Sequence, residues 1–438
     1  MDQSSTSQAI APPRAIGWLG AAILPVNGMV GAGIFAAPAV MYAAVGDFAP
    51  WMFAIMALLF LPIVWVFAQL ARRFDGSGGP QLYAQAAFGP FLGFQAGWLR
   101  YVSTAASGAA NTHVLVSYLA ALFPAADGPV MRPLLVTLIL SSFAVINIVG
   151  VKRAVAFLGT ITVGKFLPIV GLALAGLAIS PPDFSASLPQ FSAVESIALI
   201  TFYTFMGFEG VVLSAGEVKQ PRRALPSVLL ASLGLIALLY MAVQWAYIGV
   251  GGGGAEDDMP LATMAGQLAG PWAASVIAVA AVLSITANTF GDVINVPRLT
   301  FGMAQHGLLP RAFMHVNARF LTPDVSILAL LAWQVGFGLT GAFVFLAVAS
   351  TLIRIATYIL CALALPVLRR REIGRGEGGW SAGFIVMPAI AIVTCLWVAA
   401  QAGLDAYGTL AAAVVIGSVF YFIARRDPDT PEPRRPDA

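Results

Sequence analysis

Two short stretches of this sequence could bind a small charged molecule through their backbone groups. The first, VNGMVGAGIFAAPAV at residues 26–40, places Gly28, Gly31 and Gly33 close together and Pro38 after them in an apolar run. Glycine costs about 1 kcal/mol relative to alanine inside a helix, and proline about 3 kcal/mol, so we expect a helix to break here. A break leaves N–H groups unpaired at the start of one half-helix and carbonyls at the end of the other, with about half a unit of charge at each.

The second stretch carries both helix breakers and an acid. In TFYTFMGFEGVVLSAGE, residues 201–217, Gly207 and Gly210 flank Phe208 and Glu209. In lipid, a helix break is tolerated only where the freed backbone groups face protein, water or a ligand. Glu209 could bind a substrate amine or a proton, or it could be a structural carboxylate bonded to N–H groups of the neighbouring half-helix.

Patterns typical of covalent catalysis are missing from the sequence. It has no HExxH motif, no GxSxG motif and no phosphate-binding loop. The two cysteines, Cys361 and Cys395, show neither a metal-binding spacing nor a disulfide framework. We therefore expect a binding or transport protein rather than an enzyme, with no cofactor, no metal and no nucleic acid partner.

Composition predicts an all-α polytopic membrane protein. Of the 438 residues, 59% are hydrophobic and only 10% are charged, and the mean hydropathy is +0.86. A helix needs about 20 residues to cross a bilayer. We predict twelve transmembrane helices, at about 16–43, 48–70, 90–123, 131–150, 155–179, 191–215, 226–250, 271–300, 324–340, 343–368, 383–402 and 407–424.

The distribution of charge predicts the orientation of these helices. Most lysine and arginine residues lie before the first span, after the last span or in alternate loops, for example Arg72 and Lys152, whereas the opposite loops hold Arg132 alone. By the positive-inside rule both termini are cytoplasmic, in the plasma (inner) membrane. Residues 1–15 then form a cytoplasmic tail, and the Pro-rich, charged residues 425–438 a disordered one.

The two predicted breaks fall in the first and the sixth span, so five spans separate them. An odd offset inverts the second unit relative to the first. Paired discontinuous helices at corresponding positions of inverted repeats point to the central site of a secondary transporter.

The sequence also resembles the amino acid, polyamine and organocation superfamily of permeases. The matching residues are GAGIF at 31–35, GSGGPQLYAQAAFGPFLGFQAGW at 76–98, NIVGVK at 147–152, GFEG at 207–210 and PRLTFGMAQHGLLPRAF at 297–313. They occur in family order over the first ten spans. The resemblance implies the LeuT-type fold, with a five-helix repeat at 16–179, an inverted five-helix repeat at 191–368 and two additional helices at 383–424.

The resemblance and the physics of broken helices imply the same substrate site. An amino acid zwitterion needs an anion site and a cation site a few ångströms apart. The ammonium group would be bound by carbonyls around Phe205, Met206 and Gly207. The substrate carboxylate would be bound by the backbone of Gly31, Ala32, Gly33 and Ile34. The glycines have no side chain, which allows the carboxylate to approach the backbone closely. Close helix packing is the alternative explanation for glycine pairs in membrane spans.

The side chain of the substrate is harder to infer. Tyr203, Phe205 and Phe208 could wall an apolar pocket, or they could belong to the ordinary core. No acid other than Glu209 is expected near the substrate, which favours neutral amino acids over arginine or polyamines. The Gly-Phe-Glu motif resembles one that is widespread among permeases of differing substrates, which favours a structural role for Glu209.

Lys165 and Asp292 are the predicted coupling residues. A charged lysine in the fifth span costs about 2.5–3.5 kcal/mol unless it is paired or hydrated. Family members with a lysine here resemble sodium-independent carriers, in which the ammonium group replaces a sodium ion between spans one, five and eight. Asn288, Asp292 and Asn295 share one face of the eighth span, and Asp292 is a candidate countercharge. The alternative is a static ion pair that fixes the bundle.

Three other polar residues lie within the spans. We expect Arg354 to bridge helices or to line the vestibule, and Arg100 to extend its charge toward the membrane surface. His113 could titrate near neutral pH or be a satisfied interior histidine.

The predicted function is sodium-independent secondary transport of amino acids by alternating access. An exchanger or exporter, a polyamine or organic cation permease, and a transporter-like receptor remain alternatives, since fold does not fix function. The expected partners are an amino acid substrate, protons and membrane lipid, and the oligomeric state stays open. Accumulation of substrate against its gradient separates a transporter from a channel or a receptor.

Overall fold

The computed structural model describes residues 16–74, 78–149, 165–182, 184, 186–213, 215–252, 254, 257–376, 379 and 381–426. The predicted tail 1–15 and residues 427–438 of the other predicted tail lie outside the described residues. Residues 155–164, the first part of the predicted fifth span, also lie outside them, as does Lys152.

Helices make up most of the described chain, and its one β-bridge joins Ile16 to Val218. Four short 3-10 helices connect longer elements: η1 (Gly46–Phe48), η2 (Pro124–Ala126), η3 (Ala215–Glu217) and η4 (Arg311–Met314). The α-helices are α1 (Trp18–Met29), α2 (Ala32–Val45), α3 (Ala49–Ala71), α4 (Pro80–Phe88), α5 (Pro90–Leu122), α6 (Met131–Val149), α8 (Phe166–Ile179), α9 (Phe191–Thr204), α10 (Gly210–Leu213), α11 (Pro221–Gly249), α12 (Pro260–Ala269), α13 (Pro271–Gln305), α14 (Asp324–Thr340), α15 (Phe343–Gly374), α16 (Gly383–Ala400) and α17 (Leu404–Arg426).

The lengths and composition of these helices are those of a multi-pass membrane protein. Large apolar side chains on the outside of the bundle are well exposed, including Leu138, Leu174 and Val393, as a surface in contact with lipid requires. The shorter apolar helices α1, α8, α9 and α14 have 10–17 residues. Seven helical segments of the described chain are long and apolar enough to cross a membrane: Ala32–Ala71, Met131–Val149, Pro221–Gly249, Pro271–Gln305, Phe343–Gly374, Gly383–Ala400 and Leu404–Arg426.

Two helix junctions in the chain are built alike. Gly89 separates α4 from α5, and Gly270 separates α12 from α13; their φ angles are +96° and +84°. Each glycine is followed by a proline, Pro90 or Pro271, at the first position of the long helix. A positive φ suits glycine and the first helical turn suits proline. At both places the Gly-Pro pair therefore ends a short helix and begins a long one.

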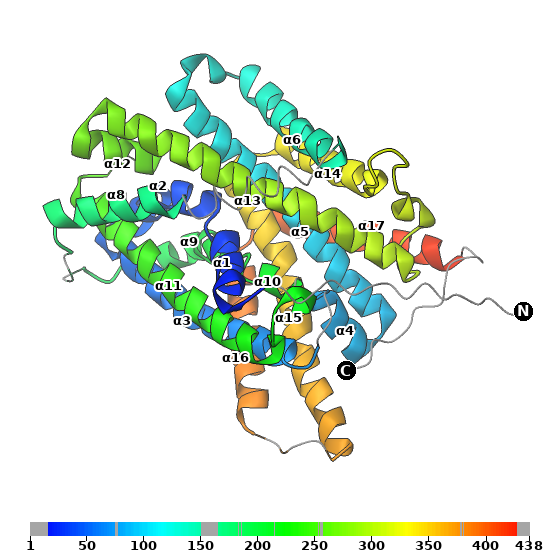
Figure 1. Ribbon diagram of the computed structural model, residues 1–438. Helices are drawn as coiled ribbons and strands as arrows, with labels where there is room; N and C mark the ends of the chain where they lie inside the picture. The colour runs from blue at the N-terminus through cyan, green and yellow to red at the C-terminus, as the bar shows by residue number, and fades with distance from the viewer. Residues whose placement is uncertain are drawn as a thin grey trace, which may run out of the picture.

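The helices of the two interrupted segments, α1 and α2 and α9 and α10, lie near the middle of the view in Figure 1. α1 packs against α10 and α11, and α2 packs against α9. α5 runs along α13, α14 and α15, and α3 runs along α11 and α16. The interrupted segments therefore pack against several of the long helices, α1 against α11 and α9 against α15.

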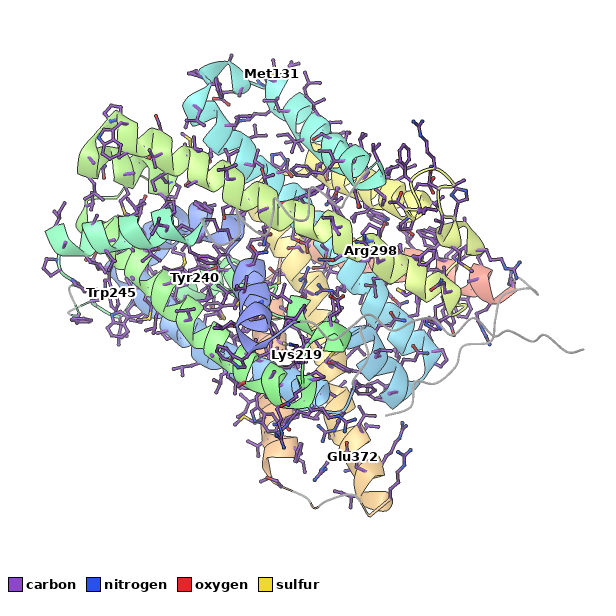
Figure 2. The ribbon with its side chains drawn as sticks, viewed as in Figure 1. Met131, Lys219, Tyr240, Trp245, Arg298 and Glu372 are labelled. Atoms are coloured by element: carbon purple, nitrogen blue, oxygen red, sulfur yellow. The ribbon has the colours of Figure 1, made fainter. Side chains whose placement is uncertain are left out.

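Charged residues Lys219 and Glu372 lie far from Met131 in the bundle. Figure 2 shows Met131 at the top, Lys219 below the middle and Glu372 at the bottom. Glu372, near the end of α15, accepts a hydrogen bond of 2.6 Å from Arg73 Nε, which follows α3. This ion pair ties the ends of two helices.

Candidate substrate site

The first interrupted segment breaks between α1 and α2. α1 ends at Met29, and α2 begins at Ala32 with Gly31 as its N-cap. The N-cap residue Gly31 has no side chain to cap α2, so among the described residues the first-turn N–H groups of Ala32, Gly33 and Ile34 have neither an intrahelical nor a capping partner. They form the positive end of the helix dipole.

Pro38 does not break the helix, although we counted it among the breakers in this stretch. α2 continues through Pro38 to Val45, despite the helical hydrogen bond that proline removes. The Pro38 carbonyl accepts a hydrogen bond of 3.1 Å from Gln244 Nε2 of α11. The break therefore lies within the glycine cluster, after Gly28 and at Gly31, and before the proline.

The second interrupted segment breaks between α9 and α10. α9 ends at Thr204 and α10 begins at Gly210. Between them, Gly207 has a φ of +100°, which glycine adopts readily. A Cβ atom at Gly207 would lie 2.5 Å from the carbonyl oxygen of Gly28. The two segments thus touch through their backbones at the breaks.

Both breaks open onto one cavity of about 130 Å³. The long helices α5, α13 and α15 contribute Arg100, Asp292 and Arg354 to its lining. The predicted substrate residues in the lining are Gly31, Ala32, Gly33, Tyr203, Met206 and Gly207. The lining does not include the predicted residues Ile34, Phe205, Phe208, Glu209 and Lys165.

The side chains of Phe205 and Phe208 pack into the core instead of facing the cavity. Both are fully buried. The Phe205 ring lies 5.7 Å from that of Tyr240, and the Phe208 ring 5.1 Å from that of Phe67, measured between centroids. Tyr203 is the one of the three predicted aromatic residues that lines the cavity.

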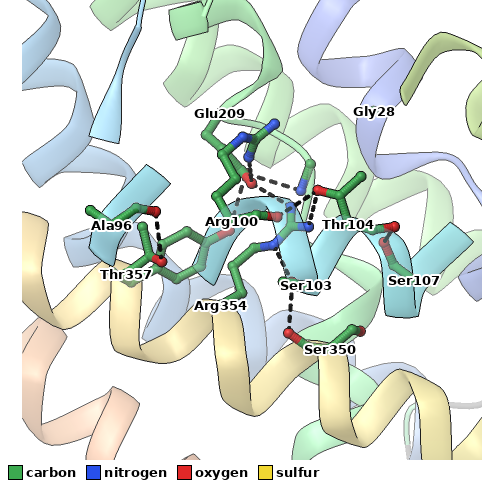
Figure 3. A network of polar contacts seen from close by, with 12 residues as sticks. Gly28, Ala96, Arg100, Ser103, Thr104, Ser107, Glu209, Ser350, Arg354 and Thr357 are labelled. Carbon is green, nitrogen blue, oxygen red and sulfur yellow. Dashed lines mark hydrogen bonds and ion pairs between the residues drawn. The ribbon is translucent and has the colours of Figure 1, made fainter. Parts of the chain in front are cut away.

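A buried ion cluster lies beside the second break (Figure 3). The carboxylate of Glu209 accepts hydrogen bonds from Arg100 Nη1 and from Arg354 Nη1, the latter at 2.5 Å. Its other oxygen accepts the Tyr358 hydroxyl at 3.0 Å and the Gly207 N–H at 3.1 Å. One carboxylate therefore joins α5, α15 and the turn between α9 and α10, and we call these three charged residues the Arg100–Glu209–Arg354 cluster.

The two arginines have different surroundings. Arg354 donates from Nε to Ser103 at 2.9 Å and from Nη2 to Thr104 at 3.1 Å. Arg100 is 5% exposed, so the expectation that it extends to the membrane surface is wrong. Its Nε is buried and makes no hydrogen bond within the described part of the chain. Pairing with a fully buried carboxylate offsets the cost of keeping each guanidinium out of water.

Replacing Glu209 by glutamine is expected to destabilise the protein, because two buried guanidinium groups would lose their shared carboxylate. Removing one partner of a buried ion pair costs about 3–5 kcal/mol of folding stability. Because the glutamine amide oxygen can still accept a hydrogen bond from an arginine, we expect a loss at the lower end, about 3 kcal/mol. Thermal unfolding in detergent measures it, with Glu195→Gln on the partly exposed part of α9 as the control. An unchanged melting temperature combined with lost proton dependence of transport would make Glu209 a proton site instead of a structural one.

Lys165 lies at the first break, immediately before α8. Its ammonium group donates hydrogen bonds of 2.8 Å to the carbonyl of Val30 and 3.3 Å to the carbonyl of Asn27. These carbonyls belong to the negative end of the α1 dipole. In the described part of the chain no ion pair joins Lys165 to Asp292, so the carbonyls are the partners that the structure gives this lysine.

A chain of amide side chains, which we did not predict, connects the two breaks. The Tyr203 hydroxyl donates to Asn111 Oδ1 at 2.8 Å, and Asn111 Nδ2 donates to Asn288 Oδ1 at 3.1 Å. Asn288 Nδ2 then donates to the Asn27 carbonyl at 2.9 Å. The asparagines within the predicted spans were the sequence signal for such a chain, but the sequence does not show which helices are neighbours. His113 bonds separately, at 2.9 Å, to the Gly338 carbonyl.

Comparison with known proteins gives the family. The family model described as amino acid permease matches residues 16–424, nearly the whole chain. This chain belongs to the amino acid permease family. The predicted resemblance to the amino acid, polyamine and organocation superfamily is confirmed, and the permease is a transporter rather than an enzyme.

Two curated relatives have names that specify a substrate. The permease is 26% identical to the branched-chain amino acid permease BcaP of Bacillus subtilis, over 97% of this chain and 95% of the relative. It is 27% identical to the serine/threonine exchanger SteT of the same organism, over 88% of this chain and 90% of the relative. It is also 26% identical to the uncharacterized amino acid permease YecA of that organism, over 82% of this chain and 87% of the relative.

Proposed function

We propose that this permease is a sodium-independent secondary transporter of neutral amino acids that works by alternating access. The observation that carries the proposal is the meeting of two helix breaks at one cavity. Uncapped N–H groups lie at one break, and the C-terminal end of α9 lies at the other. A zwitterion presents charges of both signs, and this arrangement offers a partner to each.

In the proposed complex, the substrate carboxylate binds the N–H groups of Ala32, Gly33 and Ile34. The substrate ammonium group binds carbonyls of the turn after α9, on Phe205, Met206 and Gly207. Ile34 and Phe205 bind the substrate through their backbone groups only, since their side chains are buried away from the cavity. Tyr203 and Met206 then contact the substrate from one side of the cavity. The names of BcaP and SteT both specify neutral amino acids, which supports this substrate class.

The proposed independence from sodium rests on Lys165. Its ammonium group is already bonded to the carbonyls of Asn27 and Val30, so a metal cation at the same oxygens would meet a fixed positive charge. Release and re-formation of these bonds would couple protonation of Lys165 to movement of α1. Asp292 was the predicted countercharge, and a coupling role for it requires an approach to Lys165 in another state of the cycle.

We further propose twelve membrane spans, arranged as two inverted five-helix repeats and two additional helices. The matching Gly-Pro junctions before α5 and α13 support the repeat, because each comes at the same place in the order of helices after an interrupted segment. Both termini are proposed to be cytoplasmic, in the plasma (inner) membrane, with the end of the bundle that carries Lys219 and Glu372 facing the cytoplasm (Figure 2). Exchange of one amino acid for another is a second candidate activity, favoured by the name of SteT.

Uptake into proteoliposomes tests the proposed function. Labelled amino acids should accumulate above the external concentration when the vesicles are acidic outside and neutral inside and the sodium in both compartments is replaced by choline. Preloading the vesicles with unlabelled substrate should stimulate uptake strongly if exchange is the main activity. Equilibration without accumulation under both conditions would indicate a channel, and binding without uptake would indicate a receptor.

A further inference from the structure

Asp292 is a cavity-lining acid that has no partner within the described residues. It lies on α13, in the same lining as Gly31 and Tyr203. No hydrogen bond or ion pair joins its carboxylate to another group of the described chain. A carboxylate removed from bulk water gains from any hydrogen-bond donor that reaches it. In the proposed function, a bound substrate is the molecule that fills this cavity.

The charges around Asp292 come from the ion cluster on the neighbouring helices. Arg100, Arg354 and Glu209 are the groups that interact with it electrostatically. The formal charges of these four residues, two positive and two negative, sum to zero, and the ammonium group of Lys165, which is bonded to carbonyls at the first break, does not line the cavity. A substrate side chain with its own charge would disturb this balance in a region of low dielectric, whereas a neutral side chain would not.

Arg100 also has N–H donors that make no hydrogen bond within the described residues. Its Nη1 is bonded to Glu209, but Nη2 makes no hydrogen bond within the described residues, and Nε is buried without one. The side chain is 5% exposed and lines the cavity. The substrate therefore meets an unpaired acceptor on α13 and an unused donor on α5.

We propose that Asp292 and Arg100 bind the side chain of the substrate and select amino acids whose neutral side chain carries a hydroxyl or an amide. Such a group donates to Asp292 and accepts from Arg100, and it leaves the summed charge unchanged. This inference rests on the proposed function and narrows its substrate class. Polar groups of Ser107, Asn111 and Asn288 elsewhere in the lining suit such a side chain better than a branched aliphatic one.

The isosteric pair threonine and valine tests the proposal directly. A site that bonds a substrate hydroxyl rejects the analogue without it, because its own polar groups are left unpaired. With one or two such groups left unpaired, we expect threonine to bind about 10- to 100-fold more tightly than valine. Scintillation proximity binding to the purified permease measures both affinities, with lysine and glutamate included as charged competitors that should bind weakly.

Variants of Asp292 assign the preference to that residue. Asp292→Leu should lower the threonine-to-valine affinity ratio by about 10-fold or more, because only Arg100 can then bond the hydroxyl, and Asp292→Asn should keep more of the preference, because an acceptor oxygen remains. Asp405→Asn, at an exposed position in the first turn of α17, is the matched control and should keep the full ratio.

The outcomes separate the inference from the proposed function. Valine binding as tightly as threonine in the unaltered protein overturns the inference even if the leucine variant does not fold. An unchanged ratio in folded Asp292→Leu or Asp292→Asn overturns it as well. If the unaltered permease binds no amino acid at all, the proposed function itself fails.

Discussion

Amino acid uptake by Gly33→Val is expected to fall to background, the largest effect that we predict at the substrate site. Gly33 lies in the first turn of α2, where its N–H is proposed to bind the substrate carboxylate. A Cβ atom there would already lie 3.2 Å from Thr204 Cγ2 and 3.3 Å from Thr204 Cα. Valine adds two further methyl groups on a stiff side chain, which must enter the cavity or push α2 away from α9.

The expected loss of affinity is at least about 100-fold. Hydrogen bonds to a charged group contribute about 1.5–3 kcal/mol each, and displacing the carboxylate from the α2 N-terminus weakens more than one of them. Binding of the labelled amino acid by purified protein measures the loss. Gly234→Val in α11 is the control, since a Cβ at Gly234 meets no atom within 4 Å. Wild-type affinity in a folded Gly33→Val protein would reject the proposed carboxylate site.

The positions of the helix breaks could be predicted because they depend on local sequence. Glycine weakens a helix wherever it stands, and the breaks at Gly31 and Gly207 follow the clustered glycines. The sequence could not show which of these residues interrupts the helix, because α2 continues through Pro38. Its carbonyl finds Gln244 on α11, a contact that depends on how distant helices pack.

The contents of the cavity were harder to predict, because they depend on which face each helix turns inward. Phe208 was a candidate for the substrate pocket, yet its ring packs against α3 and α15. Arg100 was expected at the membrane surface, yet it shares Glu209 with Arg354. Two arginines and one acid within predicted spans were a signal for pairing, since isolated intramembrane charges are costly. The sequence alone could not show that α5, α15 and the turn before α10 meet.

The second large effect is expected at Lys165, where Lys165→Ala should abolish uptake driven by an imposed proton gradient. The substitution removes the ammonium group that holds the Asn27 and Val30 carbonyls and so removes the link between α8 and the end of α1. Uptake in sodium-free proteoliposomes, acidic outside and neutral inside, compares the variant with the unaltered permease. The unaltered protein should show no requirement for sodium.

Lys165→Arg separates a proton-carrying role from a static one. Arginine keeps a permanent charge and five N–H donors, so it can hold the same carbonyls but cannot release a proton. If Lys165 carries the coupled proton, the arginine variant should bind substrate but lose its response to the proton gradient. If the ammonium group only fixes the position of α1, the arginine variant should transport while the alanine variant does not. Undiminished, proton-driven uptake by Lys165→Ala would exclude both roles, and a loss of uptake on sodium removal from the unaltered protein would refute the sodium independence that this lysine supports.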